Sequence, residues 1–169
     1  MSPYKPFDLS SVPFMTGTAP ALDVDSLAAE PIEQFHRWIR EAVEGGVPEA
    51  TTVTFATVDA HDHPDARTVI LQAADEQGFS VAGHGATGKA AQVAAHPSAA
   101  LNFWWQPALR AVRVRGAVST AELPEGARLW TVRPERVEFW QGSPADQQHV
   151  RIVYTADAQG GFVREVTRG

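Results

Sequence analysis

One segment near the start of the chain places its apolar residues at helical spacing. The four positions are Ile32, Phe35, Ile39 and Val43. Steps of three to four residues put these side chains on one face of a helix. Pro31 suits a first helical turn, and Gly45-Gly46 is a stop signal. The pattern therefore predicts one amphipathic helix over residues 31–44.

Most of the remaining chain alternates apolar and polar residues with the period of a β-strand. In residues 51–58, Val53, Phe55 and Thr57 alternate with their neighbours, and β-branched side chains are frequent. The predicted strands are 51–58, 66–73, 79–82, 99–105, 111–121 and 136–140, followed by a hairpin of 150–155 and 162–167. An alanine-rich helix over 88–95, with Thr87 as its N-cap, interrupts them.

These elements predict a mainly β fold with short helices (α+β), in which antiparallel strands close into a barrel. A chain of 169 residues is about one domain long. Regular structure is disfavoured in the first thirty residues by Pro3, Pro6, Pro13 and Pro20. We therefore predict an extended arm over residues 1–30 and a single domain over 31–169.

Charge and composition narrow the function. The net charge of −6 and the absence of any Lys/Arg run argue against a nucleic-acid partner. Without cysteine, the chain has no disulfide, thiolate-ligated metal or thiol nucleophile. No stretch reaches the roughly 18 apolar residues of a membrane span, and the first residues do not resemble a signal peptide. We expect a soluble, cytoplasmic protein.

Arg67 and Lys89 are the first candidates for chemistry. Arg67 begins a predicted strand and Lys89 begins a predicted helix, with Gly83, Gly85 and Gly88 close by. Two cations, glycines and a helix amino terminus can together bind a phosphate dianion. Solvated surface charges and turn glycines explain the same pattern, so spacing alone leaves both interpretations open.

Two other sequence patterns are weaker evidence for a functional site. His61-Asp-His63 lies on a predicted hairpin turn, where polar residues are common, so we expect no metal site there. No serine lies in a nucleophile motif, which gives hydrolase chemistry no support. The neighbours Trp104 and Trp105 face opposite sides of their strand, one toward the core and the other toward a subunit interface or a ligand pocket, although core packing explains the pair equally well.

Two separated blocks of sequence resemble the pyridoxamine 5′-phosphate oxidase family. The first block comprises Arg67-Thr-Val-Ile-Leu-Gln72, Gly88-Lys89, Asn102-Phe-Trp-Trp105 and Arg113-Val-Arg-Gly116. The second comprises Arg133-Pro-Glu-Arg-Val-Glu-Phe-Trp-Gln-Gly142, followed by His149 and Arg151. The resemblance covers about residues 31–155. It implies an antiparallel split β-barrel of the FMN-binding type, and FMN as the cofactor.

Carried over position by position, the resemblance implies a set of cofactor-binding residues. They are Arg67, Thr68, Val69, Ile70, Leu71, Gln72, Ala82, Gly83, Thr87, Gly88, Lys89, Trp140 and Arg151. Several side chains depart from the family pattern. A Tyr-Thr pair of the family falls on Ala82-Gly83, an Arg on Gly88 and a Gln on Ala111, so these positions lose side-chain contacts to the flavin.

The substrate residues depart further. The implied substrate-binding positions are Gln72, Gln147 and His149, with His149 also the candidate catalytic residue. A family Lys falls on Gln72 and a family Arg on Gln147. Only about ten residues separate Ala121 from Thr131, where the family has a longer helical segment that bears a Tyr, an Arg and a Ser for the substrate phosphate and a Gln-Ser pair for FMN. The chain is thus shortened and divergent at the site for the substrate phosphate.

By this resemblance the protein is an FMN-dependent oxidase that transfers a hydride from a small-molecule substrate to flavin N5 and is reoxidised by dioxygen. It would be a homodimer with FMN at the subunit interface. Pyridoxamine and pyridoxine 5′-phosphate are the family's usual substrates. Three alternatives remain open: an oxidase or reductase of another heteroaromatic compound, as in phenazine biosynthesis, an F420-dependent reductase, and a non-catalytic flavin- or haem-binding protein.

Overall fold

The computed structural model describes residues 5–169. Its helices are α1 (Pro31–Glu44) and α2 (Gly88–Ala95). Its strands are β1 (Thr52–Val58), β2 (Pro64–Asp75), β3 (Gly78–His84), β4 (Ser98–Trp105), β5 (Arg110–Glu122), β6 (Ala127–Gln141), β7 (Val150–Ala156) and β8 (Phe162–Arg168). Four short 3₁₀ turns are η1 (Leu9–Ser11), η2 (Val24–Ser26), η3 (Gln106–Ala108) and η4 (Pro124–Gly126). Both predicted helices are confirmed.

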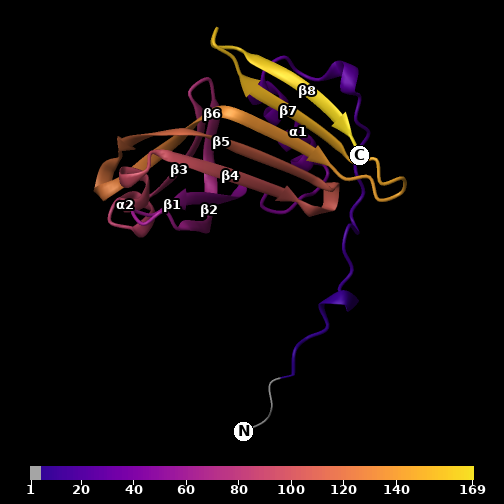
Figure 1. The fold of residues 1–169 in the computed structure, drawn as a ribbon, viewed down its shortest axis with the longest axis horizontal. Coiled ribbons are helices and arrows are strands. Elements are labelled where there is room, and N and C mark those ends of the chain that lie inside the picture. Colours follow the sequence, from indigo (N-terminus) through magenta and orange to yellow (C-terminus); the bar gives the residue numbers. More distant parts are fainter. Residues whose placement is uncertain (1–4) are drawn as a thin grey trace.

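The strands form one antiparallel sheet in the order β3-β2-β1-β4-β5-β6-β7-β8. β3 also pairs with β6, which closes the first six strands into a barrel, and β7 and β8 continue the sheet beyond the closure (Figure 1). The prediction of a mainly β barrel with short helices is confirmed. Within residues 5–169, no helix is both long and apolar enough to cross a membrane.

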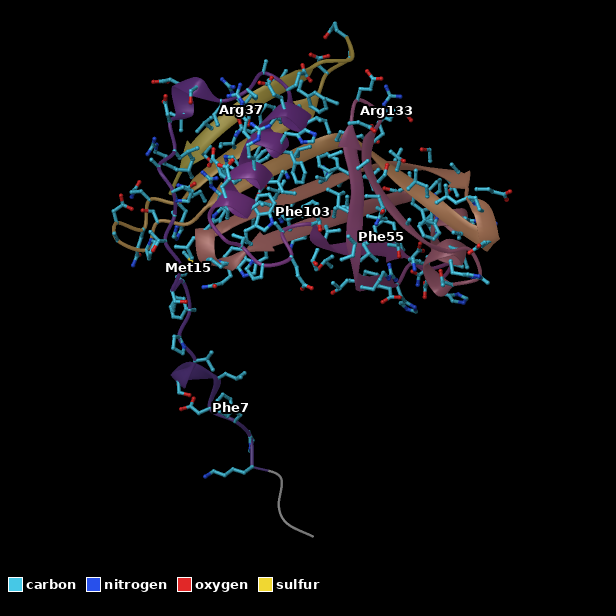
Figure 2. The ribbon with its side chains drawn as sticks, turned by 180° about the vertical axis from the view of Figure 1, so that it is seen from behind. Phe7, Met15, Arg37, Phe55, Phe103 and Arg133 are labelled. Atoms are coloured by element: carbon cyan, nitrogen blue, oxygen red, sulfur yellow. The ribbon has the colours of Figure 1, made fainter. Side chains whose placement is uncertain are left out.

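Alternation along the strands builds the core. In β1, Val53, Phe55 and Thr57 are buried, as their spacing predicts. Phe55 and Phe103 lie among the strands in Figure 2, and both are fully buried. The apolar face of α1 packs against the same cluster, with its Phe35 ring 5.0 Å from that of Phe103. Burying this apolar surface is the main force that holds helix and sheet together.

β6 differs from its prediction, because it begins at Ala127 and not at residue 136. Because Pro134 and the charged residues around it are unusual in a strand, the sequence pattern does not indicate a strand here. The structure accommodates Pro134 in an irregularity of the β5–β6 ladder opposite Gly116. A Cβ on Gly116 would lie 1.8 Å from the carbonyl oxygen of Arg133, so only glycine permits this close approach.

The first described residues leave the body of the molecule. Residues 5–14 extend away from it, with Phe7 far out and Met15 near the point of departure (Figures 1 and 2). Residues 15–30 run along the body, where Tyr154 donates a hydrogen bond to the carbonyl of Ala28 at 2.7 Å. Residues 1–4 of the predicted arm lie outside the described residues. The division into an arm over 1–30 and a domain over 31–169 stays a prediction.

Candidate functional site

Arg67 is held in a network beneath α2. Its guanidinium donates to Thr57 Oγ1 at 2.6 Å, to Gln92 Oε1 at 2.8 Å and to Asp65 Oδ2 at 2.7 Å. Gln92 lies three residues after Lys89 on α2, so the two side chains share one face of the helix. A hydrogen bond from Gln92, followed by the charge of Arg67, lowers the pKa of the Asp65 carboxyl. The position of Arg67 is therefore fixed by the protein.

Lys89 lies over Gly83 at the start of α2. Its Nζ is 5.5 Å from the ring centroid of buried Trp130, and a Cβ on Gly83 would lie 2.8 Å from Nζ. Thr87 occupies the N-cap position, as predicted, but its hydroxyl donates to the carbonyl of His84 and does not cap the helix. The start of α2 thus combines a cation, a glycine without side-chain obstruction and no side-chain cap, which suits an anion.

The other predicted cofactor residues follow the alternation of β2 and the turn after β3. Thr68, Ile70 and Gln72 are exposed on the outer face of the barrel, while Val69 and Leu71 face inward. Ala82 is half-buried and directly follows the buried part of β3, and Gly88 is exposed at the first position of α2. Within β2, side-chain contact with a ligand on the outer face is therefore open to Thr68, Ile70 and Gln72.

A second cluster lies where β6 ends and β7 begins. Trp140 and Arg151 are cross-strand partners, and the His149 ring is 5.1 Å from that of Trp140. These three side chains line a cleft of about 280 Å³ together with the carboxy-terminal residues 167–169. The backbone N–H of Ser143 donates to His149 Nδ1 at 2.9 Å. A neutral His149 consequently carries its proton on Nε2 and can donate it to a ligand.

Trp104 extends this aromatic cluster on the outer face of the sheet. Its ring is 47% exposed and lies 6.2 Å from that of Trp140, with Ala111 between them in the strand register. Trp105 is buried and donates to the carbonyl of Ala50. The prediction that the two tryptophans face opposite sides is confirmed. The small Ala111 side chain leaves room for the two exposed rings to approach each other.

A buried carboxylate anchors the cations beside Trp140. Glu138 is only 3% exposed, accepts hydrogen bonds from Arg113 at 2.5 Å and from Arg136 at 2.9 Å, and lies 3.5 Å from Arg151 Nε. Burial is the largest single influence and raises the pKa of Glu138, but the three guanidiniums together outweigh it and lower the pKa below its usual value. Sequence reasoning missed this group, because a charge on the outer face of a strand looks like ordinary surface.

Within one protomer, the cluster around Lys89 and the cluster around Trp140 lie far apart. Arg128 of β6 pairs with Gly83 beside Lys89, and Trp140 lies twelve residues further along the same strand. At about 3.3 Å per residue, this is a path of about 40 Å along the strand. α2 and the end of β6 accordingly lie at opposite ends of the molecule (Figure 1). Gln147 is exposed in the loop after β6, at the end away from Lys89.

The two clusters suit different parts of one kind of ligand. Arg67, Lys89 and the uncapped start of α2 have the charge and the donors for a phosphate monoester. Trp140, His149 and Arg151 offer an aromatic face, a hydrogen-bond donor and a cation, which suit a flat, electron-accepting ring. The residues therefore fit a flavin mononucleotide, provided that both clusters reach it.

Comparisons with known proteins agree with this chemistry. The sequence model of the family described as pyridoxamine 5′-phosphate oxidase matches residues 39–159. The pyridoxine/pyridoxamine 5′-phosphate oxidase of Ralstonia pickettii is 32% identical over 192 positions, which cover 84% of this chain and 90% of the relative. That of Burkholderia multivorans is 32% identical over 188 positions, which cover 82% of this chain and 87% of the relative. Since 84% of 169 residues is about 142, about 50 of the 192 positions have no residue in this chain.

Two solved structures have the same fold. PhzG from Burkholderia lata, in complex with tetrahydrophenazine-1-carboxylic acid, superposes with a TM-score of 0.83 at 16% identity and covers 90% of this chain and 100% of its own. A pyridoxamine 5′-phosphate oxidase-related, FMN-binding protein from Nostoc punctiforme gives a TM-score of 0.69 at 17% identity, covering 85% of this chain and 99% of its own. At these identities the two structures establish the split-barrel fold.

Proposed function

Because the chain belongs to the pyridoxamine 5′-phosphate oxidase family, we propose that it is an FMN-dependent oxidoreductase. The observation that carries the proposal is that two cations lie at α2, whose start has no side-chain cap: Lys89 is on its first turn and Arg67 is bonded to Gln92 of the same helix. When bound, the flavin supplies a hydride acceptor at N5 and a centre that dioxygen reoxidises. The protein's residues bind, orient and balance charge.

We further propose that the active form is a homodimer with FMN between protomers. The strand path of about 40 Å between the Lys89 and Trp140 clusters is far longer than an FMN molecule. A second copy solves this, because a two-fold axis can bring one protomer's Lys89 end to its partner's Trp140 end. Ile70 and Trp104, two half-exposed apolar side chains on the outer face, support an interface there.

Each residue of the second cluster has a distinct proposed role. Trp140 covers the flavin ring, and Arg151 offsets the negative charge that develops on reduction. His149 presents its Nε2–H to the substrate, because Ser143 occupies the other ring nitrogen. His149 is therefore the proposed catalytic residue.

The identity of the substrate is the more specific part of the proposal. Gln72 and Gln147 stand where the family has cations, and β5 and β6 meet in a short hairpin, so few charges remain for a substrate phosphate. Burying a phosphate dianion without cations is costly. The aromatic row of exposed Trp104 and half-buried Trp140 and His149 favours a second candidate, a flat heteroaromatic substrate without a phosphate.

Absorbance spectroscopy tests the cofactor and the substrate in one experiment. The protein is titrated with FMN and then mixed anaerobically with pyridoxine 5′-phosphate, or with an unphosphorylated aromatic acid such as tetrahydrophenazine-1-carboxylic acid. Bleaching of the flavin bands by one compound identifies its class. A single band near 420 nm in the purified protein would instead favour the deazaflavin cofactor F420. Flavin bands that no reductant bleaches would favour a non-catalytic flavoprotein.

A mixing experiment tests the shared site. Lys89→Ala removes a residue of one cluster, and Arg151→Ala removes a residue of the other. Each variant alone is expected to bind FMN weakly. After unfolding and refolding together in equal amounts, half of the dimers are mixed and each has one intact site, so about a quarter of all sites recover full affinity. No recovery would contradict a site built from two protomers.

A further inference from the structure

Arg128 lies at the start of β6, directly beside the loop that leads into α2. It is the cross-strand partner of Gly83. Its side chain passes over Gly85, where a Cβ would lie 3.0 Å from Arg128 Nε. The backbone N–H of Gly85 donates to the carbonyl of Gly126 at 2.8 Å, which holds this loop against the β5–β6 hairpin. The missing side chain of Gly85 thus leaves room for the half-buried Arg128.

Arg128 and Lys89 flank the same short segment. Lys89 Nζ lies over Gly83 and Trp130, and Trp130 is two residues after Arg128 on the same face of β6. Within residues 5–169, no carboxylate lies within 4.0 Å of either cation. Glu122 is the cross-strand partner of Arg128 on β5 but forms no ion pair with it. Two cations side by side without a carboxylate suit an anionic ligand.

The short β5–β6 hairpin is the reason that Arg128 reaches this place. The backbone N–H of Leu123 donates to the carbonyl of Ala127, so β6 starts at once and pairs with β3 from Ala127 to Val132. A long inserted segment between β5 and β6, as in the family, would separate these residues. At Gly88, by contrast, the chain has lost the cation that the family pattern places before Lys89.

Given the proposed FMN site, we propose that Arg128 is a third cation for the flavin phosphate and replaces the charge lost at Gly88. The phosphate would then meet cations from three elements: Arg67 of β2, which is bonded to Gln92 of α2, Lys89 of α2, which lies over Gly83, and Arg128 of β6, which lies over Gly85. Three positive charges offset a dianion better than two, and a guanidinium can donate two parallel hydrogen bonds to it. Nothing in the recognition of the flavin ring depends on Arg128.

Because Arg128 is proposed to contact only the phosphate of FMN, a comparison of FMN with riboflavin tests its role directly. Dissociation constants of FMN and of riboflavin, which lacks the phosphate, are measured for the full-length protein and for Arg128→Gln. Losing a hydrogen bond between charged groups is expected to weaken FMN binding about 10- to 100-fold. Riboflavin binding is expected to stay unchanged. Arg40→Gln, at an exposed arginine on α1, is the matched control and is expected to alter neither constant.

A rescue variant separates charge from structure. A Cβ on Gly88 meets no atom within 4 Å, so Gly88→Arg can restore the family's cation without a clash. In the Arg128→Gln background, Gly88→Arg is expected to recover most of the lost FMN affinity. Unchanged FMN binding in Arg128→Gln, or an equal loss for riboflavin, would overturn the role of Arg128 and leave the FMN proposal standing. A wild-type protein that binds neither flavin would refute the FMN proposal and the role of Arg128 with it.

Discussion

Replacing the buried carboxylate of Glu138 tests whether it organises the arginines beside the second cluster. Glu138→Gln keeps the size of the side chain but removes its charge. One carboxylate oxygen becomes an NH₂ group, which points a donor at arginine donors. Arg113, Arg136 and Arg151 then face one another across strands β5, β6 and β7 without the anion that separates them. Like charges in this arrangement repel.

The expected cost follows from the geometry. A hydrogen bond to a charged group contributes about 1.5–3 kcal/mol, and Glu138 makes two such bonds and one longer ion pair. Arg113 and Arg151 are more than half exposed, so water recovers much of their interaction. We therefore expect a loss of about 2–3 kcal/mol in the free energy of unfolding. For a chain of this length, that lowers the midpoint temperature by about 4–12 °C.

Urea denaturation at fixed protein concentration, from pH 7 to pH 3, measures the effect. Glu138 has a lowered pKa in the folded state, so its stabilisation is present above its unfolded pKa of about 4.3 and is lost as the pH falls through the folded pKa. The difference between wild type and Glu138→Gln should stay constant down to about pH 5 and shrink below about pH 4.3. Glu165→Gln, at an exposed carboxylate on β8, should cost less than about 0.5 kcal/mol. A loss no larger than that of the control, or a difference that persists unchanged at pH 3, would refute this role of Glu138.

Three further substitutions separate stability from function. Arg110→Ala should lower the free energy of unfolding in urea by about 3–5 kcal/mol, because this fully buried guanidinium stacks on Trp38 and pairs with Glu41 at 2.6 Å; a loss below 1 kcal/mol would contradict it. Gly83→Ala should displace the flexible tip of Lys89 and weaken FMN binding about tenfold, and it should also lower the midpoint temperature slightly, because the new Cβ lies 3.2 Å from the buried Trp130 ring. His149→Gln should lower kcat about 100-fold with FMN affinity intact, and an unaltered kcat in stopped-flow reduction would exclude His149 from catalysis.

Much of the fold could be predicted, because the signals are local. The alternation of Val53, Phe55 and Thr57 marks β1, and Pro31 with the apolar stripe behind it marks α1. The first half of β6 could not be predicted in this way. Pro134 carries a local signal against a strand, and the glycine that tolerates it, Gly116, lies on another strand. Only the register of the β5–β6 ladder in the folded protein brings Pro134 and Gly116 together.

The candidate site likewise contains some residues that the sequence indicates and others that it does not. Arg67 and Lys89 attract notice in the sequence because glycines and a family motif surround them. The network that fixes Arg67 through Gln92 and Asp65 has no such signal, since its members come from different elements. Glu138 was missed for a related reason. Its neighbours along the chain do not distinguish it from a solvated charge, and its three arginines come from three strands.

The short β5–β6 hairpin has opposite consequences for cofactor and substrate. By the resemblance, it leaves out a segment that bears ligands of the substrate phosphate in the family, and it brings Arg128 against the loop that leads into α2. On the proposed function, one change in chain length removes ligands of the substrate's phosphate and adds a cation at the flavin's phosphate. Flavin affinity and affinity for a substrate phosphate therefore need not change in the same direction. An FMN site of ordinary strength would be compatible with a substrate that carries no phosphate, so tight FMN binding alone says nothing about activity on pyridoxine 5′-phosphate.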